Sequence, residues 1–154
     1  MKVEVQRAVD GPALPAAQQI RQWAEAALQQ ARGKTQDTHM TVRIVDVDEI
    51  SRLNEQYRRK TGPTNVLSFP FEAMPGIPAE LAEAELGDVL VCAAVVQGEA
   101  QEQGKTSEAH WAHMIIHGTL HLLGYDHLND EQATEMESLE IATLAGLGYA
   151  DPYS

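Results

Sequence analysis

The residues best suited to chemistry in this chain are three histidines with a regular spacing near its C-terminal end. His117 and His121 stand four residues apart, a glycine follows at position 124, and His127 comes three residues later. Two histidines at i and i+4 lie one above the other on the same face of a helix, so their rings can share one ion. The spacing therefore predicts a metal site with His117, His121 and His127 as ligands.

Zinc suits this ligand set because neutral imidazole nitrogens are among its usual ligands. We predict one zinc ion held by three histidines and a water molecule, and an exchangeable fourth position of this kind is typical of catalytic sites. Cys92 is the one cysteine in the sequence. As an alternative, it could be the fourth ligand and close a purely structural site.

A second set of histidines competes with this one. His113, His117 and His121 recur every four residues along one helical stripe. Over that span a helix rises about 12 Å, whereas zinc holds each ring nitrogen at about 2.0–2.1 Å. These three rings cannot converge on one ion, so the third ligand has to return from another direction after Gly124. His110 and His113 are then expected on the helix surface or in contact with the ligand histidines.

The same spacing resembles the metzincin protease signature, in which a glutamate follows the first histidine and acts as the general base. Here Gly118 occupies that position, and glycine cannot take a proton from water. A glycine inside a helix also costs about 1 kcal/mol relative to alanine. We therefore expect another part of the fold to use the space beside Gly118, and charge stabilisation to come from elsewhere in the chain.

The net charge of −12 argues by itself against a nucleic-acid partner, but the charge is unevenly distributed. Residues 1–60 carry ten of the eleven lysines and arginines against eight acids, a net charge of +2. Residues 61–154 carry Lys105 against fifteen acids, a net charge of −14. The basic residues include one cluster, which consists of Arg52, Arg58, Arg59 and Lys60. This cluster is either a solvated helix end beside the negative pole of the helix dipole or a surface that binds a ligand.

Length and composition favour a single domain over residues 1–154. A chain of this length can bury enough apolar surface to fold without disulfides or a structural metal. No apolar run approaches the roughly 20 residues that span a bilayer, and the N-terminal residues lack the apolar core of a secretory signal. A lone cysteine cannot form an internal disulfide, which fits a reducing compartment. We expect a cytoplasmic protein.

Hydrophobic periodicity predicts the elements that must position the histidines. An α+β (mixed α/β) fold follows, with one roughly four-stranded sheet packed with about five helices and the metal site at the end of a helix. Residues 72–86 are expected to form a loop with at most a short helical turn. The strands are expected at Lys2–Val9, His39–Val47, Val66–Phe71 and Gly87–Cys92. The helices are expected at Leu14–Arg32, Asp46–Arg59, Ala93–Gln103, Ser107–Leu123 and Asn129–Leu144.

Several motifs together give the chain a resemblance to a known family. The segment His117-Gly-x-Leu-His-Leu-x-Gly-Tyr-Asp-His127 resembles the YbeY family of bacterial endoribonucleases. The likeness runs from about residue 40 to the C-terminal tail, in the same order and with the same spacing. Three further motifs carry it, namely Asn54-x-x-Tyr57-Arg58, Thr64-Asn-Val-Leu-Ser-Phe-Pro70 and Leu86-Gly-Asp88.

The resemblance implies a metal-dependent, single-strand-specific endoribonuclease that acts in 16S rRNA 3′-end maturation and ribosome quality control. Its partners would be single-stranded RNA, 16S rRNA and the small ribosomal subunit. It also implies that His117, His121 and His127 bind the metal, usually taken as zinc, and that Arg58 is functionally important. Asn65 stands where many members of the family have aspartate, so no catalytic role is expected for it.

Elementary chemistry agrees with the role of Arg58. Phosphodiester cleavage develops negative charge, and a guanidinium forks onto phosphate oxygens with a fixed geometry. Arg58 is therefore the predicted catalytic residue. Asp126 is either a solvated turn residue or an acceptor that orients the ring of His127. Two other functions stay open at this point: a non-catalytic ribosome assembly factor that binds RNA through the metal site and a basic groove, and a metalloprotease.

Overall fold

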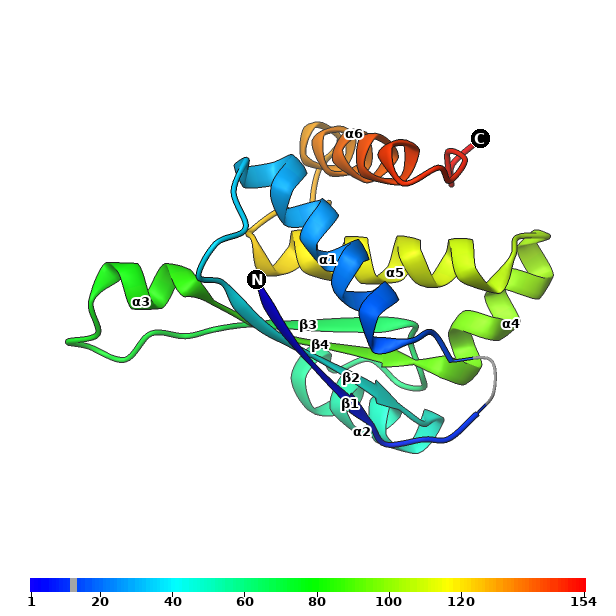
Figure 1. Cartoon of the computed structure of the whole chain (residues 1–154). Coiled ribbons are helices and arrows are strands. Elements are labelled where there is room, and N and C mark those ends of the chain that lie inside the picture. The colour runs from blue at the N-terminus through cyan, green and yellow to red at the C-terminus, as the bar shows by residue number, and fades with distance from the viewer. Residues whose placement is uncertain (12–13) are drawn as a thin grey trace.

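One mixed sheet with helices on both faces makes up the computed structural model, which describes residues 1–11 and 14–154 (Figure 1). The described residues form four strands and six helices, which confirms the predicted α+β fold. The strands are β1 (Lys2–Arg7), β2 (His39–Val45), β3 (Val66–Pro70) and β4 (Glu85–Cys92). The helices are α1 (Ala17–Arg32), α2 (Val47–Arg58), α3 (Ala79–Ala84), α4 (Ala93–Gln103), α5 (Ser107–Leu122) and α6 (Asp130–Gly146).

The strand order β1-β2-β4-β3 places the short strand β3 at one edge of the sheet. Strands β1, β2 and β4 run parallel, whereas β3 runs antiparallel to β4, with Leu67 opposite Leu90. Pro70 ends β3 and has no N–H to offer a neighbouring strand, which agrees with its predicted position at a strand end or edge. The outer side of β3 is therefore free of strand pairing and available to line a site.

Helices α5 and α1 cover one face of the sheet, and α6 packs on these two helices on the side away from the strands (Figure 1). Eleven of the sixteen residues of α5 are buried, so this helix is enclosed on nearly all sides, as expected for a helix without a polar face. Helix α2 covers the opposite face over a smaller apolar cluster. The ends of α5 and α2 are therefore held in fixed positions relative to the edge strand β3.

Helix starts follow the predicted capping residues. Asp46 accepts a hydrogen bond from the backbone N–H of Glu49 at 2.8 Å, and Asn129 accepts one from that of Gln132 at 2.9 Å. Each bond satisfies an N–H group that has no partner inside its helix. Asn129 is the cap of α6, and the following Asp130 is the first residue of the helix.

Most predicted element boundaries agree with the structure to within two residues, and the differences with a clear local cause or consequence lie in α1, β1 and the segment before β4. Helix α1 begins at Ala17 rather than Leu14, because Leu14 precedes Pro15 and a residue before proline avoids the helical region. Strand β1 ends at Arg7, two residues early. Residues 79–84 form the short helix α3 inside the predicted loop, and β4 consequently begins at Glu85.

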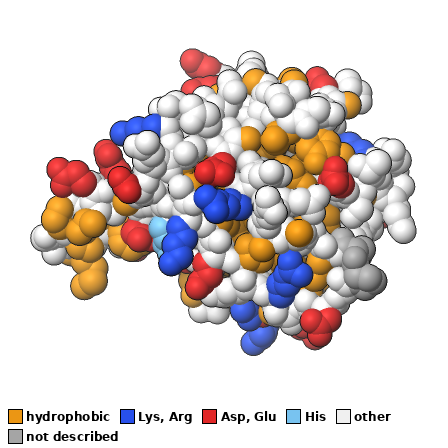
Figure 2. Space-filling model, viewed as in Figure 1, with side chains coloured by type: hydrophobic (Ala, Val, Ile, Leu, Met, Phe, Trp, Pro, Cys, Tyr) orange, Lys and Arg blue, Asp and Glu red, His pale blue; other side chains and the backbone are white. Residues whose placement is uncertain are grey.

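The connection between β3 and β4 projects from the body of the protein and carries α3 (Figure 1). Apolar and acidic side chains gather on this projection (Figure 2). Met74 and Leu81 are its most exposed large apolar residues, at 72% and 59%. Within residues 1–11 and 14–154, no helix combines the length and the apolar character needed to cross a bilayer.

Candidate metal centre and its cleft

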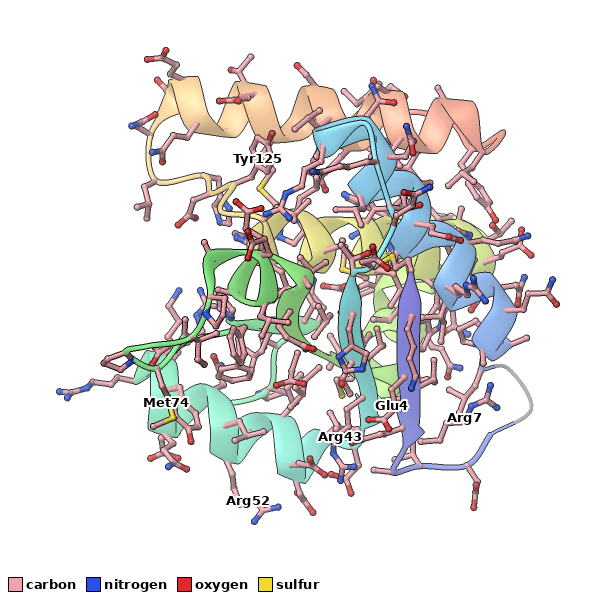
Figure 3. All side chains as sticks on the ribbon, turned by 60° about the vertical axis from the view of Figure 1, so that its left-hand side comes forward. Glu4, Arg7, Arg43, Arg52, Met74 and Tyr125 are labelled. Carbon is pink, nitrogen blue, oxygen red and sulfur yellow. The ribbon has the colours of Figure 1, made fainter. Side chains whose placement is uncertain are left out.

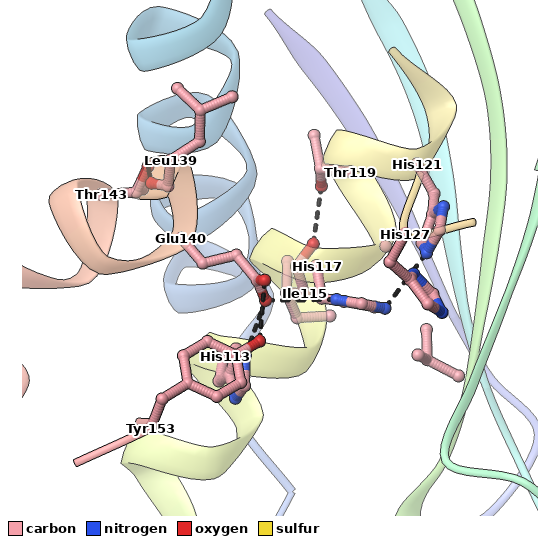
Figure 4. A network of polar contacts seen from close by, with 12 residues as sticks. His113, Ile115, His117, Thr119, His121, His127, Leu139, Glu140, Thr143 and Tyr153 are labelled. Atoms are coloured by element: carbon pink, nitrogen blue, oxygen red, sulfur yellow. Dashed lines mark hydrogen bonds and ion pairs between the residues drawn. The ribbon is translucent and has the colours of Figure 1, made fainter. Parts of the chain in front are cut away.

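The three predicted ligand histidines come together at the C-terminal end of α5. The Nε2 atoms of His117 and His121 face each other at 3.1 Å, one helical turn apart. The ring centroid of His127 lies 5.9 Å from that of His117 and 5.2 Å from that of His121. One nitrogen from each ring lies within 4.8 Å of the other two. The described residues therefore contain a three-histidine group that could hold a metal ion (Figure 4).

The chain reverses after α5 through a turn that depends on Gly124. Gly124 has a φ of 98°, a left-handed backbone conformation that residues with a side chain rarely adopt. Its N–H donates to the carbonyl of His121 at 3.1 Å, and the N–H of Tyr125 donates to that of Leu120 at 3.1 Å. These bonds close the helix end and bring His127 back towards the two helical histidines.

The donor atoms of this group fit a divalent metal such as zinc. Two nitrogens that bind one tetrahedral zinc at about 2.0–2.1 Å are separated by roughly 3.3 Å, close to the 3.1 Å between the Nε2 atoms of His117 and His121. Burial, followed by the neighbouring His117 charge, lowers the pKa of His121 to about 4. His121 is therefore neutral at physiological pH, and the neutral ring is the form that binds metals.

Arg58 lies at the same cleft as the three histidines, although it comes from the opposite face of the sheet. It is the last residue of α2, and the edge strand β3 lies between α2 and the end of α5. The cleft has a volume of about 730 Å³, within the usual range of ligand sites of about 300–1,000 Å³. Its charged or ionisable lining residues are Arg58, Lys60, His117, His121, Tyr125, Asp126 and His127.

Asp126 does not orient the ring of His127 in this structure. Its Oδ1 atom lies 3.7 Å from Nδ1 of His127, beyond hydrogen-bond distance. The same oxygen accepts a hydrogen bond from the backbone N–H of His127 at 2.8 Å. Of the two roles considered for Asp126, the geometry therefore favours that of a turn residue.

Glu140 on α6 bonds to the ring of His117 instead, a contact that the sequence patterns did not predict. It is 1% exposed, and its Oε2 atom accepts hydrogen bonds from Nδ1 of His117 at 3.1 Å and from Nε2 of His113 at 2.6 Å. Its Oε1 atom accepts one from the hydroxyl of Tyr153 at 2.8 Å. Figure 4 shows the carboxylate between these three side chains.

The surroundings of Glu140 keep it ionised. Burial by itself raises its pKa, but the hydrogen bonds from His113 and His117 and the charge on those rings outweigh burial and lower the pKa to about 2. Burial, followed by the nearby carboxylate of Glu140, raises the pKa of Tyr153, so its hydroxyl remains a donor. Tyr153 is 48% exposed as a residue, yet its hydroxyl end reaches the buried carboxylate.

The other polar residues considered from the sequence have structural partners. His113 and His110 are 7% and 3% exposed, so neither lies on the helix surface. His113 is linked to His117 through Glu140, which bonds to both rings. His110 bonds to Glu99 at 2.9 Å, and Asn65 donates to Glu99 at 3.2 Å. Buried Cys92 packs in the apolar cluster under α2 and belongs to neither metal-competent group of the described residues.

Gly118 allows α5 to lie directly against the sheet, as expected from its position in the helix. A Cβ atom there would meet Cγ1 of Val89 at 2.7 Å and Cγ2 of Val66 at 3.2 Å. The hydroxyl of Ser68 also donates to the carbonyl of Gly118 at 2.9 Å, which ties α5 to β3. A glutamate in this position would point into the sheet rather than into the cleft.

Gly118→Ala is expected to lower the free energy of unfolding by up to about 2 kcal/mol, and by about 1–3 kcal/mol relative to an alanine placed where a helix has room for it. Overpacking against Val89 costs about 1–3 kcal/mol, and the better helix propensity of alanine returns only about 1 kcal/mol. Gly98→Ala in α4 is the matched control, because a Cβ atom there meets nothing within 4 Å. Urea unfolding of both variants measures the difference. A Gly118→Ala protein as stable as the Gly98→Ala protein would contradict this account of the packing.

Comparison with known proteins agrees with the fold and the motifs. The model of a family described as Endoribonuclease YbeY matches residues 8–148. Among solved structures, the chain is similar to the solution structure of TM1509 from Thermotoga maritima, with a TM-score of 0.57 and 24% sequence identity. That similarity covers 99% of each chain and concerns the fold alone. The family match includes α2, α5 and the turn that carries His127.

Proposed function

Because the chain belongs to the endoribonuclease YbeY family, a family of nucleases in ribosomal RNA maturation, we propose that it cleaves single-stranded RNA internally in a metal-dependent reaction. The proposed ligands are His117, His121 and His127, the proposed metal is zinc, and Arg58 is the proposed catalytic residue. We further propose that residues 1–154 act as one cytoplasmic domain in 16S rRNA 3′-end maturation and ribosome quality control on the small ribosomal subunit.

One observation carries the proposal: Arg58 and the three histidines line the same cleft. They come from α2, α5 and the turn after α5, so three separate parts of the chain contribute to it. Arg58 is exposed at a helix end, and its guanidinium has no hydrogen bond or ion pair among the contacts of the described residues. It is therefore available to bind an anionic group in the cleft.

The charge around this cleft supports RNA as the ligand in spite of the acidic composition. Arg58 and Lys60 line it against a single described acid, Asp126, whereas the whole chain carries a net charge of −12. Acidic surface elsewhere repels phosphates, so RNA binding should concentrate at the cleft and weaken steeply with salt. Because only Arg58 and Lys60 among the described residues are available for phosphate contacts in this cleft, the affinity for RNA should also be modest.

The residues of the cleft divide the chemistry between them. A metal held by the three histidines would act as a Lewis acid on a phosphoryl oxygen and make water more acidic. Arg58 binds a non-bridging phosphate oxygen and stabilises the charge that develops there during cleavage. Lys60 attracts the RNA backbone as a point charge at the cleft rim. Gly118 supplies no carboxylate beside the first histidine, and its packing against Val89 argues against a protease of the metzincin kind.

Turnover of a circular single-stranded RNA by the zinc-loaded protein tests this function. Cleavage of a circle requires an internal cut, so exonuclease contamination gives no signal. The same sequence held in a duplex is the matched substrate, and we expect it to be cut at least about tenfold more slowly, because paired bases cannot splay into a cleft. Binding without any cleavage would favour the non-catalytic assembly factor and refute the proposal. Analysis of product ends identifies the nucleophile, since a 2′,3′-cyclic phosphate requires the RNA 2′-hydroxyl.

A further inference from the structure

The surroundings of Glu140 determine which nitrogen of His117 carries the proton. A carboxylate can only accept hydrogen bonds, and three donor groups surround this one, from His113, His117 and Tyr153. The Nδ1 atom of His117 must therefore carry a hydrogen. In the neutral form that binds a metal, an imidazole has only one N–H, so the Nε2 atom of His117 then keeps its lone pair. That Nε2 atom is the one that faces His121.

We propose that Glu140 is a positioning residue that fixes the ring orientation and the tautomer of His117, so that His117 binds the metal through Nε2. The inference rests on the proposed three-histidine metal site. A carboxylate behind a ligand imidazole also makes the ligating nitrogen a stronger donor, and the loss of such a partner typically costs about 10–100-fold in metal affinity.

Glu140 is itself held in a single orientation by two further side chains. Tyr153 binds Oε1 and His113 binds Oε2, so the plane of the carboxylate is fixed from both sides. Tyr153 lies in the C-terminal segment, which is tied to the body of the protein where Lys105 donates to the carbonyl of Pro152 at 3.1 Å. The segment that carries Tyr153 therefore takes part in orienting His117, which lies 36 residues earlier in the chain, on α5.

A second metal ion at His113, His117 and Glu140 is the rival interpretation, because one ligand atom from each lies within 4.8 Å of the other two. The distances favour hydrogen bonds. Glu140 Oε2 lies 2.6 Å from Nε2 of His113, shorter than the roughly 3.3 Å that separates two ligand atoms on a tetrahedral zinc. Glu140 and His113 are also buried, at 1% and 7% exposed.

The test is a comparison of zinc affinity by competition with a chelating dye, using the full-length chain. Glu140→Gln keeps the shape of the side chain but removes its charge, and we expect a loss of about 10–100-fold in affinity. Glu135→Gln is the matched control on the exposed side of the same helix and should bind zinc like the wild type. Tyr153→Phe removes one hydroxyl and should give a smaller loss than Glu140→Gln. Far-ultraviolet circular dichroism confirms that each variant is folded.

A second measurement needs neither zinc nor activity. In the metal-free wild-type protein, long-range ¹H–¹⁵N spectra should show His117 with its proton on Nδ1. In Glu140→Gln that preference should weaken, because the neutral amide is a poorer acceptor than the carboxylate. Finding the proton of wild-type His117 on Nε2 would overturn the inference even if Glu140→Gln bound zinc weakly. This readout also covers the case in which Glu140→Gln fails to fold.

The outcomes separate this inference from the proposed function. Wild-type zinc affinity in folded Glu140→Gln overturns the positioning role and leaves the three-histidine site untouched. If the wild-type chain bound two zinc ions and Glu140→Gln bound one, Glu140 would be a ligand of a second metal ion and the positioning role would be wrong. A weakened affinity in Glu140→Gln together with an absence of RNA cleavage by the wild type supports the positioning role and contradicts the nuclease proposal only.

Discussion

His117→Ala and His121→Ala are each expected to reduce RNA cleavage by on the order of 10³-fold or more, because each removes one of the three proposed metal ligands. Two remaining imidazoles bind zinc far more weakly, so metal content should fall in parallel with turnover. His39→Ala is the matched control. His39 is the partly exposed first residue of β2, where it bonds to Glu85 at the start of the neighbouring strand β4, and its loss should change neither metal content nor turnover.

The two ligand variants should differ in stability although they agree in activity. His117 donates to the buried Glu140, so His117→Ala leaves that carboxylate with one partner fewer, at a cost of about 1–3 kcal/mol. The side chain of His121 bonds to the ring of His117 and to the backbone of Tyr125, and no bond joins it to Glu140 among the described residues. Urea unfolding of the metal-free proteins should therefore show His117→Ala as the less stable variant.

Two results would contradict this interpretation. RNA cleavage at the wild-type rate by either ligand variant, with contaminating nuclease removed, would show that the three-histidine group is not the catalytic centre. Equal stability of the two metal-free variants would show that the bond between His117 and Glu140 contributes little to the fold. Because the measurements are independent, each result tests one of the two roles of His117.

The clustering of the three histidines could be predicted from sequence because its geometry is set within eleven residues. A helical turn fixes the relation of His117 to His121, and a glycine after the helix fixes the direction in which the chain returns to His127. Gly118 was also informative, since a glycine in a helix interior has a cost that close packing has to offset.

Glu140 was missed because its role depends on how two helices pack. The spacing of Met136, Glu140 and Leu144 did contain a signal, because residues at i, i+4 and i+8 share one helical face and the first and last of these are apolar. An acid in the middle of a buried stripe needs a partner. The sequence could not identify that partner, because the packing of α6 on α5 decides which histidines it meets.

Arg58 marks another limit of reasoning from periodicity. Four basic residues cluster near the end of α2, and their pattern alone does not separate a solvated helix end from a ligand site. The resemblance to a family selected Arg58, and the fold brings it to the cleft across the edge strand β3. The short helix α3 was expected only as a short helical turn within a loop, since its helical stretch follows the turn signals Pro75, Gly76 and Pro78.

Arg58→Ala is expected to lower kcat/KM for single-stranded RNA by about 10²–10³-fold, the usual effect of removing one group that stabilises transition-state charge. Zinc content should stay at the wild-type level, because Arg58 is not among the metal-competent groups. Arg52→Ala is the matched control on the same helix. Arg52 points away from the body of the protein in Figure 3 and does not line the cleft, so its loss should change turnover little.

Arg58→Lys separates a general positive charge from the specific geometry of a guanidinium. A lysine keeps the charge but cannot fork onto two phosphate oxygens, so it should restore RNA binding more than it restores kcat. If Arg58→Lys matched the wild type in both, Arg58 would act only through its charge, the role proposed for Lys60 at the same cleft. If Arg58→Ala kept wild-type kcat and lost affinity alone, Arg58 would hold the RNA in place rather than stabilise the transition state, because an interaction made only in the transition state lowers kcat.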